Sequence, residues 1–129
     1  MVMNKECQKA VIDGYIAAYN AFDVEGMLAL IHPRVVFKNI TGNEITAKAH
    51  GINELRTMAD RSKSLFSSRC QQISSFSSVG DTATVAINYE GVLATDLPNG
   101  MKSGETLKLI GRSIFQFREG KLHRITDFS

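Results

Sequence analysis

The chain has 129 residues, of which 43% are hydrophobic and 22% charged, a composition typical of a globular protein with one core. Its formal net charge is +2 and no run of like charge occurs, so we expect no nucleic-acid partner. Charged Lys5, Glu6 and Lys9 interrupt the place of a signal peptide's apolar run, and no stretch approaches the about 18 apolar residues of a membrane span, which favours a cytoplasmic protein without membrane contact.

The first third of the chain shows helical periodicity. Apolar residues at steps of three and four predict a buried helix. Its stripe is made of Cys7, Val11, Tyr15, Ala18 and Phe22 and is widened by Ile12, Ile16 and Tyr19. Asp23 is a suitable N-cap for a second, short helix that continues until His32-Pro33. Gly51 precedes a third helical stripe, made of Ile52, Leu55, Ala59, Ser62 and Phe66.

Strand-like alternation describes the rest. Residues 34–40 (RVVFKNI) place Val35, Phe37 and Asn39 on one face, and residues 44–50 (EITAKAH) predict a second short strand. Four long strands are expected after Ser67, separated by Gly-containing turns. Their predicted inward residues are Ala83, Val85, Ile87, Tyr89, Leu107, Leu109, Gly111, Ser113, Phe115 and Phe117.

The opposite face of residues 106–117 predicts a subunit contact. It mixes apolar and polar side chains and is too apolar for a freely solvated face; its members are Lys108, Ile110, Arg112, Ile114 and Gln116. We therefore expect a homodimer formed through the outer face of the sheet.

Metal and cofactor motifs are missing from the sequence. Cys7 and Cys70 have neither a nearby cysteine nor a histidine at metal-ligand spacing, so we expect two buried thiols. Three histidines without carboxylates at helical spacing predict no metal site, and no dinucleotide, P-loop or nucleophile-elbow motif occurs. We therefore expect no metal site.

The order of elements, together with residues 15–39 (YIAAYNAFDVEGMLALIHPRVVFKN), the His50-Gly51 turn and residues 115–128 (FQFREGKLHRITDF), resembles the nuclear transport factor 2-like superfamily. Within it the chain looks like the SnoaL-like polyketide cyclases and the ketosteroid isomerases. The resemblance implies one α+β domain over residues 1–129. In that fold a cone-shaped, curved, mixed but mostly antiparallel sheet wraps around three N-terminal helices, a cystatin-like α+β barrel, and encloses a pocket for a small apolar molecule.

The resemblance also implies site residues. In ketosteroid isomerase an Asp abstracts a proton, while a Tyr and a protonated Asp donate hydrogen bonds to the oxyanion. Tyr15 matches the Tyr, but the two carboxylate positions fall on Asn39 and Ser113, so that mechanism is not supported. The polyketide cyclase branch carries its acid/base Asp on the last strand, where Asp127 stands. The resemblance places His123, Ile125 and Asp127 on the pocket face, whereas the apolar pattern alone fits Leu122 and Phe128 equally well.

Each candidate has a plainer alternative. Asp127 is either a buried acid/base or an exposed carboxylate paired with Arg124 or Lys121. Tyr15 either donates a hydrogen bond in the pocket or only packs in the core. An inward Asn39 amide orients a carbonyl or bonds the adjacent backbone.

The remaining candidates belong to the pocket wall. His50 either contacts the ligand or is a surface histidine at a turn. Ser113, Phe37, Phe115 and Phe117 are predicted to contact the substrate, the three phenylalanines as an apolar wall.

Two functions fit this pattern. The first is a cofactor-independent enzyme that isomerises, cyclises or dehydrates an apolar cyclic or polyketide-like molecule, with Asp127 and Tyr15 as catalytic residues. The second is a non-catalytic ligand-binding or dimerisation module of the same fold, favoured by the loss of both ketosteroid isomerase carboxylates. The sequence does not decide whether the chain is an enzyme.

Overall fold

Two helices lead into the sheet in a computed structural model that describes residues 3–129. Helix α1 (Lys5–Asn20) is capped by the Asn4 side chain, which accepts a hydrogen bond from the Cys7 amide at 2.8 Å. The predicted N-cap Asp23 starts helix α2 (Val24–Leu28) by accepting from the Gly26 amide at 2.9 Å. This helix ends earlier than predicted, because the His32-Pro33 pair already belongs to the first strand.

The buried face of α1 includes the predicted Ile12, Tyr15 and Ile16, but Gln8 is buried in place of Cys7, which is exposed. Gln8 can be buried because its amide nitrogen donates to the Gly80 carbonyl at 2.8 Å and its oxygen accepts from Ser78 at 2.5 Å. A polar side chain is stable inside a protein when its hydrogen bonds are made, and this one links α1 to the tip of the β3–β4 hairpin.

The six strands form one sheet in the order β2-β1-β6-β5-β4-β3. Their bounds are β1 (Ile31–Thr41), β2 (Glu44–His50), β3 (Phe66–Val79), β4 (Thr82–Leu93), β5 (Thr106–Arg118) and β6 (Lys121–Phe128). All neighbours are antiparallel except β1 and β6, which run parallel. The predicted second short strand and the four long strands after it are thus confirmed, and the sheet is open, with β2 and β3 at its edges.

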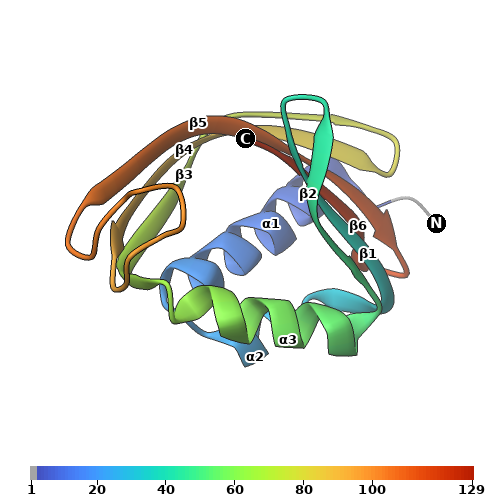
Figure 1. The fold of residues 1–129 in the computed structure, drawn as a ribbon. Helices are drawn as coiled ribbons and strands as arrows, with labels where there is room; N and C mark the ends of the chain where they lie inside the picture. Colours follow the sequence, from blue (N-terminus) through green and yellow to red (C-terminus); the bar gives the residue numbers. More distant parts are fainter. Residues whose placement is uncertain (1–2) are drawn as a thin grey trace.

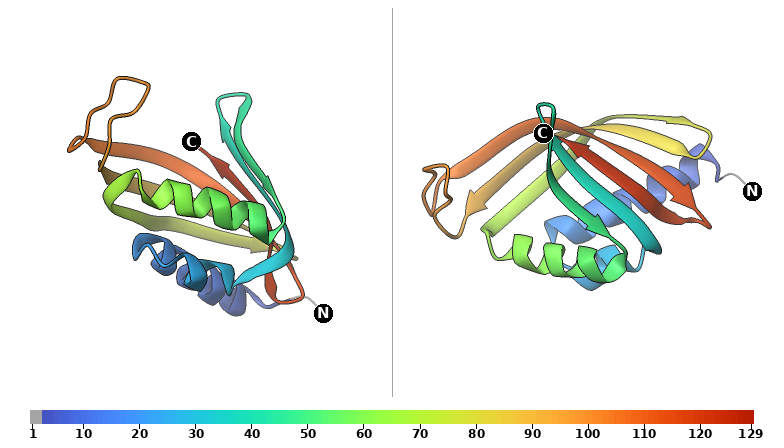
Figure 2. Two further views of the ribbon diagram at one scale, coloured as in Figure 1. Left: turned by 60° about the horizontal axis from the view of Figure 1, so that its bottom comes forward. Right: turned by 45° about the vertical axis from the view of Figure 1, so that its right-hand side comes forward.

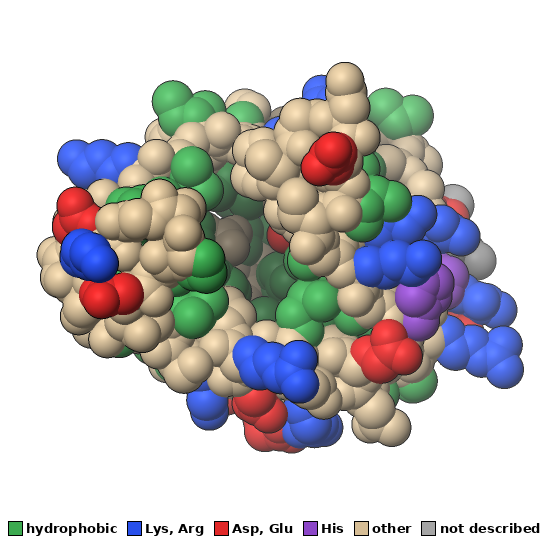
Figure 3. Space-filling view, viewed as in Figure 1, with side chains coloured by type: hydrophobic (Ala, Val, Ile, Leu, Met, Phe, Trp, Pro, Cys, Tyr) green, Lys and Arg blue, Asp and Glu red, His purple; other side chains and the backbone are tan. Residues whose placement is uncertain are grey.

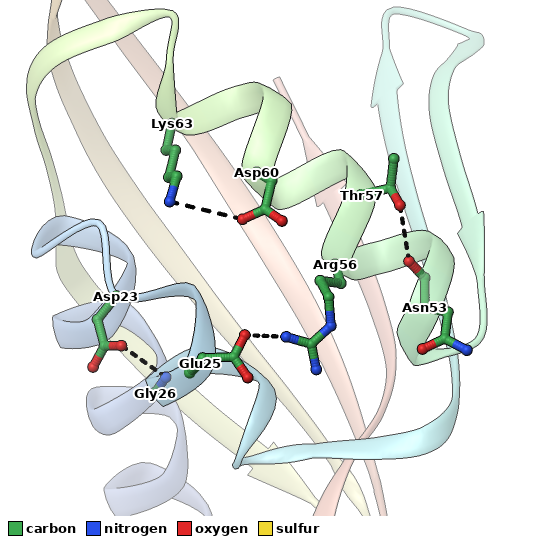
Figure 4. A network of polar contacts seen from close by, with 8 residues as sticks. All are labelled: Asp23, Glu25, Gly26, Asn53, Arg56, Thr57, Asp60 and Lys63. Carbon is green, nitrogen blue, oxygen red and sulfur yellow. Dashed lines mark hydrogen bonds and ion pairs between the residues drawn. The ribbon is translucent and has the colours of Figure 1, made fainter.

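The sheet arches over the helices. Figures 1 and 2 show α1 beneath the concave face and α3 (Ile52–Lys63) crossing the open side of the arch. Contacts join α1 to β3 and α3 to β1 and β2. Figure 4 shows the ion pair between Arg56 of α3 and Glu25 of α2, which ties the two helices together. The α+β class, the curvature and the mostly antiparallel order agree with the expectation.

The hydrophobic core fills one end of the arch. Ile12 of α1 meets inward residues of β1, β4, β5 and β6, of which Val35, Val85, Phe115 and Ile125 are almost completely buried. Burial of such side chains is the main stabilising contribution to a fold of this size. The core stops short of the other end, and the space left there contains the candidate site.

The expectation of two buried thiols is wrong. Cys7 and Cys70 are both exposed rather than buried. Cys70 lies on β3 next to Arg69, which takes the buried position in its place because strand side chains alternate between the two faces.

Within residues 3–129, none of the helices is long and apolar enough to cross a membrane.

Candidate functional site

One row of side chains crosses three neighbouring strands on the concave face. Asn39 of β1 pairs with Asp127 of β6 in parallel register, and Asp127 pairs with Ser113 of β5 in antiparallel register. Paired residues on adjacent strands project to the same face of a sheet. The two positions where ketosteroid isomerase has carboxylates therefore lie on either side of Asp127.

Asp127 forms the centre of the site. The Ser113 hydroxyl donates a hydrogen bond to its Oδ1 at 2.6 Å, and neither Lys121 nor Arg124 forms an ion pair with it. Burial among protein atoms raises the pKa of the Asp127 carboxyl from 3.8 to about 6, and the Ser113 hydrogen bond opposes that rise. The side chain keeps partial contact with solvent through the cavities described next.

Two adjoining cavities meet at Asp127. The outer cavity, of about 270 Å³, lies over β4 and β5 and includes Asn39, Ser113, Leu107 and Leu109 in its lining. The inner cavity, of about 150 Å³, lies between α1, α2, α3 and the sheet. Both share Tyr19, Gln71 and Asp127. Figure 3 shows the hollow in the arch, lined largely by hydrophobic side chains.

Tyr15 projects from α1 into the inner cavity. Its ring packs edge-on against Phe115, with 5.9 Å between ring centroids. Burial, and then the nearby Asp127 carboxylate, raise the pKa of Tyr15 well above its ordinary value, so its hydroxyl stays protonated. The Tyr15 hydroxyl makes no hydrogen bond to another group of residues 3–129, which leaves it free to donate to a ligand.

The cavities also contain a pair of tyrosine hydroxyls and a buried arginine. The Tyr19 and Tyr89 hydroxyls lie 3.0 Å apart, and burial, followed by the neighbouring Tyr19 and this hydrogen bond, raises the pKa of Tyr89. Arg69 of β3 is only 6% exposed and lines the inner cavity, with its guanidinium 3.7 Å from the centroid of the Tyr19 ring. Inward alternation already predicted Tyr89, but nothing in the Ser-rich β3 sequence predicted a buried arginine.

The predicted wall residues are distributed unevenly. Phe37 lines the inner cavity, and Asn39 lines the outer one with its amide nitrogen 2.8 Å from the Thr46 hydroxyl. Phe115 and Phe117 lie in the packed core and line neither cavity, because they project from β5 beyond Ser113 toward the filled end of the arch. Their expected contact with substrate is therefore not supported.

His50, His123 and Ile125 were predicted near the pocket, but they line neither cavity. His50 is exposed and lines neither cavity, and its backbone amide donates to Glu54 at the start of α3. The geometry matches the plainer alternative of a surface histidine at a turn. His123 packs edge-on against His32, with 5.1 Å between ring centroids, and Ile125 is buried in the core. Of the three β6 residues expected to face the pocket, only Asp127 lines it.

Within residues 3–129, no group of three or more His, Cys, Asp or Glu side chains is arranged to hold a metal ion. The side chains that line the two cavities include one carboxyl group, that of Asp127, several hydroxyl groups and the guanidinium groups of Arg69 and Arg112. Such groups transfer protons and stabilise developing negative charge on oxygen.

Comparison with known structures identifies the fold. A putative polyketide cyclase from Xanthomonas campestris pv. campestris is 22% identical, with a TM-score of 0.76 over 98% of this chain and 93% of that one. TsrD from Streptomyces laurentii is 19% identical, with a TM-score of 0.78 over 97% of this chain and 89% of that one. AclR, a putative hydroxylase from Streptomyces galilaeus, is 14% identical, with a TM-score of 0.77 over 96% of this chain and 89% of that one. At these identities the likeness concerns the fold, which is nuclear transport factor 2-like.

The family follows from the sequence. The model of the SnoaL-like domain matches residues 12–125, most of the chain, and the chain belongs to this family. A search of curated proteins gave no match. Structures of this fold include proteins described as a cyclase and as a hydroxylase, so the reaction has to be argued from the site itself.

Proposed function

We propose that the protein is a cofactor-independent enzyme that moves a proton on an apolar cyclic or polyketide-like substrate, with Asp127 as the acid/base. The observation that carries the proposal is the position of the Asp127 carboxyl, where an outer and an inner cavity meet. A carboxyl with a pKa of about 6 accepts and returns protons close to neutral pH, which an ordinary exposed Asp does poorly.

The chemistry follows from the free atoms around the carboxyl. Ser113 occupies Oδ1, so Oδ2 is the oxygen that takes a proton from a carbon next to a substrate carbonyl. Tyr15 donates a hydrogen bond to that carbonyl oxygen as negative charge develops on it. Returning the proton to a different atom isomerises the substrate. Attack of the enolate carbon on a second carbonyl cyclises it, and the alkoxide formed takes the proton back from Asp127. Loss of a β-hydroxyl, which leaves as water with the proton from Asp127, dehydrates it.

The substrate class is supported by the walls. Apart from Asp127 and its polar neighbours, the linings include Phe37, Leu55 and Met58 in the inner cavity and Ile87 and Leu109 in the outer one. Cavities with mostly apolar walls and few polar groups bind apolar molecules and orient them through those polar groups. Asn39 at the outer end is placed to contact a second oxygen of the substrate.

A hydrogen-exchange assay tests the proposal. Cyclic ketones such as 2-tetralone are screened for binding by thermal shift, and each binder is incubated with the protein in deuterated water. The proposal predicts deuterium incorporation next to the carbonyl, measured by mass spectrometry, at a rate that falls about 100-fold or more in Asp127→Asn. Tyr15→Phe slows it less, and the exposed control Asp60→Asn leaves it unchanged. Binding without exchange contradicts the enzyme and supports the non-catalytic module.

We also propose that two copies pair through the outer face of the sheet. The residues at its centre support this: Ile110 of β5 is 85% exposed, and a groove beside it includes Gln72, Asn88 and Lys108. In the proposed dimer a second copy would cover this exposed isoleucine. Sedimentation at micromolar concentration should show a dimer that Ile110→Glu dissociates, and a monomeric wild type would contradict the pairing.

A further inference from the structure

Arg69 is buried without a counter-charge. Its Nε donates to the Tyr19 carbonyl at 2.8 Å, and its guanidinium stacks on the Tyr19 and Phe22 rings, 3.7 and 4.4 Å from their centroids. Its Nη1 is buried and has no hydrogen-bond partner within residues 3–129. No carboxylate of these residues lies within ion-pair distance of it.

Burying the Arg69 guanidinium without a counter-charge costs free energy in the protein without a ligand. A buried cation loses its hydration, and the loss is compensated only when an anion and hydrogen-bond acceptors replace the water. The aromatic rings and one carbonyl supply part of that compensation, but the Nη1 donor remains unsatisfied. An anionic oxygen bound beside the guanidinium would supply the missing counter-charge.

The space beside Arg69 limits what that ligand is. The inner cavity has about 150 Å³, which holds roughly one benzene-sized ring, and its apolar lining includes Met27, Phe37, Leu55, Met58 and Ala59. Arg69, Tyr15 and Asp127 line the same cavity. An apolar compartment with a cation in its wall fits a ring that bears an anionic group.

We propose that Arg69 binds the carboxylate of a ring-bearing organic acid whose ring occupies the inner cavity. Arg is suited to this because its planar guanidinium presents parallel donors to the two oxygens of a carboxylate. The proposal rests on the proposed function in one respect, since it assigns the acid as the substrate class of that site. It places the carboxylate at Arg69 and leaves Asp127 and Tyr15 to act on the reacting part of the substrate.

The test compares two probes that differ in charge and hardly in shape, sodium benzoate and benzamide, by ligand-observed NMR titration at pH 7. The structure predicts that benzoate binds at least tenfold more tightly than benzamide, and that Arg69→Met abolishes this preference. Arg69→Lys retains a preference for benzoate, because a cation remains. The matched control is Arg112→Met, which removes an exposed arginine of the outer cavity and should leave the preference intact.

Several results would overturn the assignment. One is equal affinity of the wild type for both probes, a result that does not depend on whether any variant folds. Another is a preference for benzoate that survives Arg69→Met and disappears in Arg112→Met. The outcome is independent of catalysis, because Asp127→Asn should still prefer benzoate while losing deuterium exchange. Benzoate preference without any exchange therefore refutes the proposed enzyme and leaves the Arg69 site standing, and exchange without benzoate preference does the reverse.

Discussion

Replacing Asp127 by Asn is expected to stabilise the fold while abolishing the proposed chemistry. The folded pKa of about 6 lies above the ordinary 3.8, so the folded protein holds the Asp127 proton more tightly than the unfolded chain does. The resulting stabilisation is complete below about pH 4 and is lost as pH rises through about 6. At about 1.4 kcal/mol per pKa unit, the loss is at most about 3 kcal/mol, because the cavities still admit some water.

Urea unfolding of wild type and Asp127→Asn at several pH values measures this loss. The difference in unfolding free energy between the two should change by up to about 3 kcal/mol in favour of the variant between pH 4 and pH 7, which moves the urea midpoint by about 1 M or more. Other titrating groups cancel in the comparison, and Asp60→Asn, an exposed carboxylate on α3, is the control. A wild-type-minus-variant difference that does not depend on pH would refute the reasoning.

Three further perturbations have defined outcomes. Ser113→Ala removes the hydrogen bond that lowers the Asp127 pKa, so the pH at which this acid is half protonated should rise, as followed by the infrared band of the protonated carboxyl; an unchanged midpoint contradicts the contact. Gly111→Ala places a Cβ 2.4 Å from the Phe128 carbonyl oxygen and should destabilise the protein by about 1–3 kcal/mol in thermal unfolding. Gln8→Leu leaves a carbonyl of the β3–β4 turn without its donor and should cost about 1–3 kcal/mol in urea unfolding, whereas a neutral effect would show that the bond is dispensable.

Much of the fold could be predicted because it depends on local patterns. Alternation in β4 and β5 predicted the inward residues correctly, from Val85 and Ile87 to Ser113. The Asp23 cap and the glycine turns were likewise visible in short windows. These features are set by neighbours within a few residues in the sequence, which periodicity and turn chemistry report directly.

The features that could not be predicted depend on distant partners. Gln8 is buried because Ser78 and Gly80, about 70 residues later, form hydrogen bonds with its amide. Hydrophobicity alone does not detect these bonds, and it therefore placed Cys7 and not Gln8 on the buried face of α1. Arg69 is buried because its guanidinium stacks on a ring of α1. Hydropathy patterns treat both residues as solvent-facing, and only the folded arrangement shows that each has an internal environment.

The site itself was predicted in part. The resemblance brought Asp127, Tyr15, Asn39 and Ser113 to one region, and the structure places all four at the two cavities. The orientation of Asp127 remained ambiguous in the sequence because β6 carries apolar residues on both faces. Pairing with Asn39 on one side and Ser113 on the other decides it, and strand register is not encoded in any single strand.

The proposed acid/base role requires the Asp127 carboxyl to exchange its proton near neutral pH inside the cavity. A carbon-13 NMR titration of the side-chain carboxyl, assigned by its absence in Asp127→Asn, measures this property without any knowledge of the substrate. We expect a midpoint near pH 6 for Asp127. A midpoint at the ordinary value near 3.8 would mean that the carboxyl is well solvated, and it would contradict the proposed acid/base role.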